Sequence, residues 1–346
     1  MSKRKNVLKA VCVLLALLFV VAALAAGAGK KTAELKPVKG KMKLLFIPFT
    51  MEHVFQKELC DGAKIPIPGC NIDVIIEDPY GKIEKEIDIL ETYMNQNING
   101  VVMYPIDSQA LKPIVQELKA KGIWVFTTGN HVEGEILGMG TDERDGGILA
   151  ADMFIRWWKA NRAGKKPAIL LLDVPRIPEP QRKMIAFEEI VSQKIPDATF
   201  FHVDSNGSTE PAMIGTEQYL QSHPEINFIF GINASATLGG IAACENAGRL
   251  DIAHASCGAE PPILALLKKP LSAQGGGVVW DIGYGKSAVQ YGNHLVEVAC
   301  KVMRAGDASG QKIDIGFQEV WRDNVDKVIA TMQEWRKKAG LSPVQF

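Results

Sequence analysis

Short apolar runs alternate with longer segments of helical spacing from residue 41 onward. The first series of runs covers residues 43–49, 72–77, 100–105, 123–127 and 136–140, and the second covers residues 167–173, 199–204, 227–231, 251–256 and 275–280. Runs that are apolar along their whole length are typical of parallel strands buried on both faces. Between them, Leu111, Ile114, Val115 and Leu118 recur at the spacing of one helix face. Two such series predict an α/β fold of two doubly wound, Rossmann-like lobes.

The ends of the predicted strands are where a ligand site is expected. In parallel sheets, ligands bind beyond the carboxyl ends of the strands, and with two lobes the natural pocket is the cleft between them. Helix 144–162 begins the second series, and we interpret its Trp157-Trp158 pair as packing. Residues 324–338 predict a final amphipathic helix, followed by a frayed end.

Composition and charge narrow the class of protein. The chain has 346 residues, 47% of them hydrophobic and 23% charged, which suits two globular domains and excludes a disordered or fibrous chain. Without residues 1–28, which hold four basic and no acidic residues, 35 basic residues face 39 acidic ones, a net charge near −4. A chain of this charge is a poor candidate for binding nucleic acid.

The N-terminus has the pattern of a secretory signal. A basic start precedes the apolar segment Val11–Ala26, and Ala26-Gly27-Ala28 suits cleavage after Ala28. A permanent membrane anchor is the alternative, although the apolar run is shorter than the ~20 residues of a spanning helix. We therefore expect residues 1–28 to be a cleaved signal peptide and the protein to be exported to the periplasm or cell envelope.

Five cysteines remain beyond the signal segment. An exported protein can form disulfides, and Cys60–Cys70 and Cys244–Cys257 are locally plausible pairs that leave Cys300 over. Buried free thiols are the equally weighted alternative. No pair has CxxC spacing, so we expect neither a zinc site nor a redox motif.

Motifs for common enzyme chemistry are missing from the sequence. It has no GxxxxGK[ST] loop, no HExxH, no EF-hand loop and no GxSxG elbow, and residues 275–277 precede a strand instead of following one. We expect no cofactor, no metal ion and no catalytic residues. A binding protein is favoured over an enzyme.

Several local signatures then occur in a fixed order, and together they resemble one family. They are Asp61-Gly62-Ala63, Asn99-Gly100-Val101-Val102 before Tyr104-Pro105-Ile106-Asp107-Ser108, Gly140-Thr141-Asp142 before Gly146-Gly147, and Phe230-Gly231-Ile232-Asn233 before Leu238-Gly239-Gly240. The set resembles the ribose-binding-protein group of periplasmic substrate-binding proteins, relatives of the lactose-repressor effector domain. The resemblance covers nearly the whole mature chain.

The resemblance implies a type I periplasmic binding protein, whose lobes are joined by three crossovers and close on a ligand. The crossovers are expected near Thr141-Asp142, near Gly276-Gly277 and after a long helix at 282–304. That division gives an N-terminal lobe of residues 41–141 plus 277–306, a C-terminal lobe of 142–276 plus 307–323, and a C-terminal helix and tail of 324–346. It further implies a monomer that delivers its ligand to an ABC permease in the inner membrane.

The resemblance also implies candidate ligand contacts in the first lobe. In sugar-binding members the first strand-end loop carries aromatic and polar residues, because rings stack on the sugar and polar groups bond its hydroxyls. The matching residues here are Phe49, Glu52, His53, Phe55 and, after the third strand, Tyr104. Core packing is the alternative for Phe55 and Tyr104. At the fourth strand end, Gly129-Asn130 replaces the ribose-type Asp-Arg pair. Asn130 remains a candidate, but ribose itself is placed in doubt.

In the second lobe the expected contacts are fewer and less regular. Asn233 matches the family's ligand-binding Asn and is the strongest single candidate. Lys183 holds the register of the family's Arg, and the preceding Gln181 and Arg182 are candidates, with surface charges as the alternative. Glu260 stands where the family has Asp, and capping a helix is its alternative role. The remaining candidates are Asp142 at the hinge and Trp280.

Trp280-Asp281 resembles a Trp-Asp pair at the hinge of the rhamnose- and furanosyl-autoinducer-binding branch. Trp280 is expected either to form a wall of the pocket or to pack at the hinge, and Asp281 to cap the long helix.

These residues are compatible with three functions. The first is an exported solute receptor that captures a sugar or sugar-like ligand for an ABC importer. The second is a sensor module for a membrane chemoreceptor or kinase, or a binder of a nucleoside or quorum signal. The third is an exported hydrolase that pairs Glu52 with Asp142, which requires the two carboxyl groups to converge.

Overall fold

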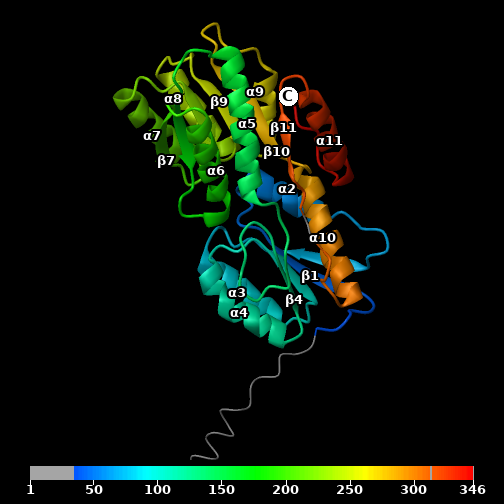
Figure 1. Cartoon of the computed structure of the whole chain (residues 1–346). Helices are drawn as coiled ribbons and strands as arrows, with labels where there is room; N and C mark the ends of the chain where they lie inside the picture. The colour runs from blue at the N-terminus through cyan, green and yellow to red at the C-terminus, as the bar shows by residue number, and fades with distance from the viewer. Residues whose placement is uncertain (1–34, 312–313, 346) are drawn as a thin grey trace, which may run out of the picture.

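The computed structural model describes residues 35–311 and 314–345, so the predicted signal peptide lies outside the described part. Two α/β lobes face each other across a gap in Figure 1. The first sheet has the strand order β2-β1-β3-β4-β5, with every pair parallel. Its strands are β1 (Met42–Ile47), β2 (Ile72–Ile76), β3 (Gly100–Met103), β4 (Trp124–Thr127) and β5 (Leu137–Gly138).

Helices cover both faces of the first sheet, as the fully apolar strands require. One face packs against α2 (Val54–Ala63) and α10 (Ala288–Ala305), around Phe46, Leu59 and Leu295. The other packs against α3 (Ile83–Met94) and α4 (Ser108–Ala120), around Ile47 and Leu118.

The second sheet repeats the same winding and adds one antiparallel strand. Its order is β11-β10-β9-β8-β6-β7, and only the β10–β11 pair is antiparallel. Its strands are β6 (Ala168–Asp173), β7 (Thr199–Asp204), β8 (Phe228–Gly231), β9 (Ala253–Cys257), β10 (Gly277–Tyr284) and β11 (Phe317–Val320). The prediction of two doubly wound lobes is confirmed.

The helices of the second lobe are α5 (Glu143–Asn161), α6 (Pro178–Lys194), α7 (Thr209–Ser222), α8 (Ala234–Asn246), α9 (Pro261–Lys268) and α11 (Val325–Lys338). Trp157 and Trp158 pack in the core of this lobe against Phe154 and Phe228, as their interpretation as packing residues expected. Helix α11 packs on α9 and on the β10–β11 end of the sheet. No helix in the described part of the chain is long and apolar enough to cross a membrane.

The chain passes between the sheets three times, from β5 to α5, from β10 to α10 and from α10 to β11. The second passage differs from the sequence prediction, which put it near Gly276-Gly277 and assigned the segment after it to the first lobe. Strand β10 instead pairs with β9 through Ile282, so residues 277–284 belong to the second sheet.

The apolar run of β10 continues past Trp280 to Tyr284. The break follows at residues 285–287, where the Ser287 hydroxyl accepts a bond from the Gln290 N–H and caps α10. Asp281 is therefore not the helix cap.

Helices α2 and α10 approach each other closely because each contributes a glycine to the contact. A Cβ on Gly62 would lie 1.9 Å from the Val289 carbonyl oxygen, and one on Gly292 would lie 1.9 Å from the Leu59 carbonyl oxygen. No real side chain tolerates such a distance. Both glycines are thus required by the helix contact.

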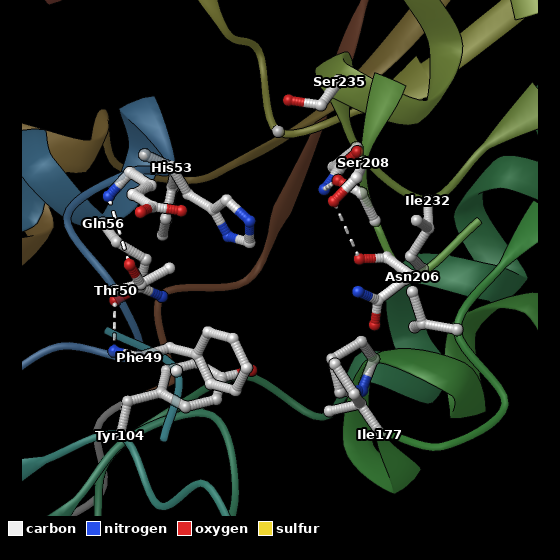
Figure 2. Close-up of a pocket in the computed structure, with 18 of the residues that line it drawn as sticks. Phe49, Thr50, His53, Gln56, Tyr104, Ile177, Asn206, Ser208, Ile232 and Ser235 are labelled. Atoms are coloured by element: carbon white, nitrogen blue, oxygen red, sulfur yellow. Dashed lines mark hydrogen bonds between the residues drawn. The ribbon is translucent and has the colours of Figure 1, made fainter. Parts of the chain in front are cut away.

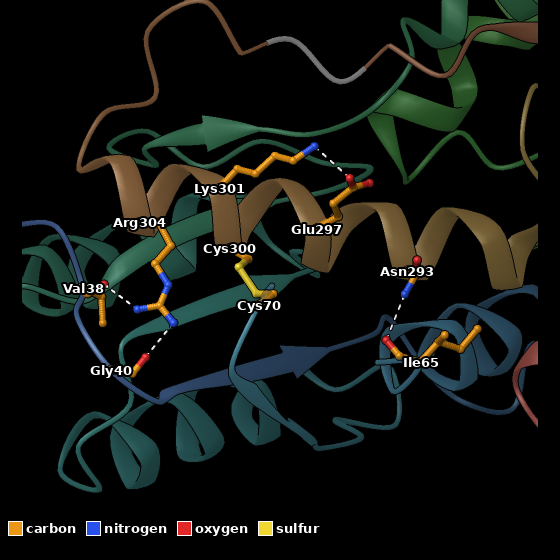
Figure 3. The surroundings of a disulfide bond; sticks show 9 residues. All are labelled: Val38, Gly40, Ile65, Cys70, Asn293, Glu297, Cys300, Lys301 and Arg304. Atoms are coloured by element: carbon orange, nitrogen blue, oxygen red, sulfur yellow. Dashed lines mark hydrogen bonds and ion pairs between the residues drawn. A yellow bond between two sulfur atoms is a disulfide. The ribbon is translucent and has the colours of Figure 1, made fainter. Parts of the chain in front are cut away.

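A disulfide joins Cys70, just before β2, to Cys300 in α10 (Figure 3). The two locally plausible pairs considered from the sequence, Cys60–Cys70 and Cys244–Cys257, do not form. Cys60, Cys244 and Cys257 are buried free thiols. Cys60 lies in α2 and faces the core, whereas α10 brings Cys300 over the start of β2. The disulfide partner of Cys70 therefore cannot be inferred from sequence separation. Beside the disulfide, Arg304 donates to the Val38 carbonyl at 2.9 Å and holds the start of the described chain against α10.

Candidate ligand-binding cleft

A cavity of about 380 Å³ lies between the two lobes. Its volume is within the range of roughly 300–1,000 Å³ that small-molecule sites occupy. Both walls are made by loops at the carboxyl ends of strands, where the sequence predicted the site. The residues that line it include Phe49, Thr50, Glu52, His53, Phe55, Gln56, Tyr104, Ile177, Lys183, Asn206, Gly207, Ser208, Asn233, Ser235, Cys257, Glu260 and Tyr284.

The first-lobe wall is aromatic. The Phe49 ring meets Tyr104 edge-on with 5.7 Å between centroids, and stacks with His53 at 6.1 Å. Figure 2 shows these rings facing Ile177 and Asn206 across the gap. Gly129 makes room for Tyr104, since a Cβ there would lie 2.2 Å from the Tyr104 ring. The replacement of the family's charged pair by Gly129-Asn130 therefore accompanies the insertion of this ring.

Hydrogen bonds from neighbouring loops fix the backbone of the first-lobe wall. The Gln56 side chain accepts from the Phe49 N–H at 3.3 Å, and the Asp78 carboxylate accepts from the Met51 N–H at 3.1 Å and from Tyr80 at 2.8 Å. Gln56 lines the cavity and was missed as a candidate. Its position in the first turn of a helix after a strand-end loop was the available signal.

The second-lobe wall sets polar side chains beside the apolar Val174, Ile177, Pro180 and Ile232. Asn233, the N-cap of α8, organises its polar part. Its Oδ1 accepts from the Ala236 N–H at 2.9 Å, and its Nδ2 donates to the Gly207 carbonyl at 2.9 Å. Asn233 thus lines the cavity as predicted and also ties the β8–α8 loop to the β7–α7 loop. Asn206 and Ser208 of that second loop face the cavity (Figure 2) and were missed. The Asn206-Gly207 turn after an apolar strand was the signal for them.

Lys183 is buried at the base of the cavity, within the second lobe. Its side chain is 2% exposed, and its Nζ lies 2.7 Å from Glu143 Oε2 and 3.0 Å from Cys257 Sγ. The Tyr284 hydroxyl donates to the other Glu143 oxygen at 3.0 Å. Burial lowers the pKa of Lys183, but the neighbouring Cys257 and Glu143 outweigh it and leave the pKa raised, while burial raises the pKa of the Cys257 thiol to about 12. The ammonium group therefore stays charged and is paired with Glu143 and Cys257 inside the second lobe.

Glu260 precedes α9 but does not cap it through its side chain. Its carboxyl group forms no ion pair with any residue in the described part of the chain, and it lines the cavity. Burial raises the pKa of Glu260 to about 7, against a lowering effect of the Ala234 N–H. The capping alternative is wrong, and the carboxyl group is available to the cavity.

Five candidates do not line the cavity. Trp280 is fully buried in the second-lobe core against Phe228 and Phe230, so it forms neither a pocket wall nor a hinge contact. Its strand continues to Tyr284, and Tyr284 reaches the cavity in its place. Asn130 is buried beneath the first-lobe wall and donates to the Pro105 carbonyl at 2.8 Å, which supports the Tyr104 loop.

Of the other three candidates, Asp142 and Arg182 join the start of α5 to α6, and Gln181 joins α6 to the loop after β6. The Asp142 carboxylate accepts from the Arg144 N–H at 2.9 Å and forms an ion pair with Arg182 at 3.0 Å. Gln181 accepts from the Val174 N–H at 3.0 Å. Because Asp142 is committed to Arg182 outside the cavity, it does not converge with Glu52 on a common substrate, and the pair proposed for a hydrolase is not formed. No cluster of three metal-ligating side chains occurs among residues 35–311 and 314–345.

The protein has two doubly wound lobes with a ligand-sized cavity between them. This is the architecture of a protein that binds a small molecule in an interlobe cleft. Residues 44–305 match the family profile of the periplasmic binding protein domain. The chain therefore belongs to the periplasmic binding protein family, which confirms the resemblance seen in the sequence. This is a family of binding proteins, in agreement with the expectation that the chain is not an enzyme.

Individual relatives are distant. The ribose import binding protein of Bacillus subtilis strain 168 is 26% identical over 227 residues, which cover 65% of this chain and 72% of the relative. The galactose/methyl-galactoside binding periplasmic protein of Haemophilus influenzae is 23% identical over 261 residues, covering 70% and 77%. A solved periplasmic solute binding protein of an ABC transporter from Actinobacillus succinogenes, with bound D-allose, superimposes with a TM-score of 0.72 at 19% identity. That superposition covers 83% of this chain and all of the other.

Proposed function

We propose that this protein is an exported solute receptor that captures a small sugar or sugar-like ligand in the interlobe cleft and delivers it to an ABC importer. The observation that carries the proposal is the composition of the two facing walls. Aromatic rings on one wall suit the apolar face of a sugar, and amide and hydroxyl groups on the other suit its hydroxyls. The names of the relatives, which describe binding of ribose, galactose and methyl-galactoside, support the same ligand class.

The two walls belong to different lobes, so a ligand that contacts both is bound most tightly when the lobes are close. Closure expels water, and the polar groups then fix the orientation of the ligand. Three chain passages between the lobes form the hinge for such a motion. We expect the ligand to be released unchanged, because the Glu52–Asp142 carboxyl pair that a hydrolase would need does not form in the described residues.

The proposal is tested by a thermal-shift screen of the mature protein with monosaccharides, polyols and nucleosides, followed by calorimetry. A true ligand at a hundredfold excess over its Kd adds about 2.7 kcal/mol to the stability. Tyr104→Ala and Asn206→Ala should each lower the affinity for the ligand, because the first removes a stacking ring and the second removes an amide group. Glu117→Gln, on the exposed side of α4, is the matched control. Binding of nucleosides without any sugar or polyol would contradict the proposed ligand class.

Asn233→Ala is expected to weaken binding through a different route. Loss of the amide breaks the hydrogen bonds to Gly207 and Ala236. The β7–α7 loop should then shift, and one contact to the ligand is lost as well. Unaltered affinity in this variant would remove Asn233 from the site.

A further inference from the structure

The charges that line the cleft are unbalanced. Apart from tyrosines and Cys257, the titratable side chains that line it are Glu52, His53, Lys183 and Glu260, and no arginine among the described residues does. Lys183 is already neutralised by Glu143 at 2.7 Å. Burial lowers the pKa of His53, so its imidazole is neutral near pH 7. In the part of the chain that the structure describes, the cleft therefore offers two carboxyl groups and no unpaired cation.

Of these two carboxyl groups, Glu260 is the one that is withdrawn from water. Glu52 is exposed at the mouth, whereas Glu260 is half-buried in the wall. A carboxylate withdrawn from water without a cation or several donors carries a desolvation cost. Among residues 35–311 and 314–345, the Ala234 N–H is the one donor to Glu260, and the ionisable groups that act on it are acidic. They are Glu58 on α2, which is paired with Arg336, and Asp281 on β10, whose carboxyl group is fully buried.

A ligand that carries a positive charge would complete this site. An ammonium group next to Glu260 supplies the missing cation and forms charge-assisted hydrogen bonds, which are about twice as strong as neutral ones. The rings of Phe49, Tyr104 and Phe55 line the same cavity, and aromatic faces attract cations. An anionic ligand would meet two carboxyl groups with no compensating charge.

We propose that Glu260 makes this cleft selective for a polyhydroxylated ligand that bears a positively charged amino group, and that the cleft rejects sugar acids and sugar phosphates. The inference rests on the proposed function, since it specifies the ligand class of the same cleft. It adds a charge preference that the sugar-binding proposal alone does not contain.

The test compares sugars that share one ring and carry a positive, a neutral or a negative group. The amino sugars have an ammonium group in place of one ring hydroxyl, and the uronates have a carboxylate in place of the terminal hydroxymethyl group. Calorimetry at pH 7.0 and low salt measures galactosamine, galactose and galacturonate, and the matching glucosamine, glucose and glucuronate. We expect the amino member of the better series to bind at least tenfold more tightly than the neutral member. The acidic member should bind at least tenfold more weakly than the neutral one.

Glu260→Gln keeps the shape of the side chain and removes its charge. It should cost the amino ligand at least tenfold in affinity and change the neutral ligand by less than threefold, whereas Glu117→Gln changes neither. Glu52→Gln should have the smaller effect, because that carboxyl group is exposed. Thermal melting of each variant establishes that it is folded, and the wild-type ratios test the charge preference without any variant.

The outcomes separate the two proposals. If the neutral sugar binds as tightly as its amino counterpart, or if Glu52→Gln abolishes the preference and Glu260→Gln does not, the inference is wrong while the proposed function stands. If no member of either series and no other sugar or polyol binds, the proposed function falls, and this inference falls with it.

Discussion

Replacing Lys183 by methionine tests whether the buried ion pair between Lys183 and Glu143 stabilises the base of the cleft. The variant keeps most of the side-chain volume but removes the cation that lies 2.7 Å from Glu143 Oε2, in a pair whose side chains are 2% and 10% exposed. Breaking a buried ion pair by removing one partner costs about 3–5 kcal/mol. Here Glu143 keeps the Tyr284 hydroxyl at 3.0 Å, so we expect the lower end, about 3 kcal/mol. For a unit of about 150–250 residues that unfolds in one step, such as a single lobe, that corresponds to a fall in Tm of roughly 6–12 °C.

The double variant Lys183→Met/Glu143→Leu distinguishes a charge effect from lost packing. Because it leaves no unpaired buried charge, it should recover most of the lost stability, as apolar replacement of buried pairs often does. The assay is calorimetric unfolding of both variants and the wild type, read lobe by lobe because two lobes need not unfold in one step. A loss below about 1 kcal/mol in the single variant, or a double variant no more stable than the single one, would refute this reasoning.

Three further predictions concern stability. Gly62→Ala should destabilise the protein by about 3 kcal/mol in a denaturant titration, because the clash with the Val289 carbonyl exceeds the gain of up to ~1 kcal/mol in helix propensity; unchanged stability would contradict the close contact of α2 and α10. His254 is 3% exposed and burial lowers its pKa to about 4, below the unfolded value of 6.5. The stability that neutral His254 allows is fully present above pH 6.5 and is lost as the pH falls toward 4. Between these pH values the wild type should therefore lose about 3 kcal/mol more of its free energy of unfolding than His254→Phe does. Equal losses in the two proteins would mean that His254 does not titrate in this range. Reduction of Cys70–Cys300, or its replacement by two alanines, should lower stability by about 2–5 kcal/mol, measured as a lower Tm with reductant than without, since the bond closes a loop of 230 residues; an unaltered Tm would argue against the bond.

Several sequence signatures that identified the family are required by helix packing and not by the ligand. Gly62 lies where α2 meets α10, Gly147 faces the Lys183 backbone with a built Cβ 2.2 Å from its carbonyl oxygen, and Gly239 faces the Thr209 carbonyl at 2.2 Å. Fold and strand-end loops could be read from the sequence because hydrophobic period and loop position are local properties. The signatures therefore identify the family more reliably than they identify the residues that contact the ligand.

The features that the sequence did not reveal depend on distant contacts. Lys183 looks like an ordinary helix residue until Glu143 and Cys257 are brought to it from other elements. Trp280 and Tyr284 lie on one strand, and only the pairing of β10 with β9 shows that the second residue reaches the cleft and the first enters the core. The Cys70–Cys300 bond likewise depends on where α10 returns to the first sheet.

Closure of the two lobes on an unmodified ligand is the central claim, and small-angle X-ray scattering of the mature protein tests it most directly. The radius of gyration should fall when a sugar or amino sugar that binds in the calorimetric screen is added at saturation. Dialysis should then restore the original value and return the same compound intact. An identical scattering curve with and without a bound ligand, or recovery of a chemically altered compound, would contradict the account.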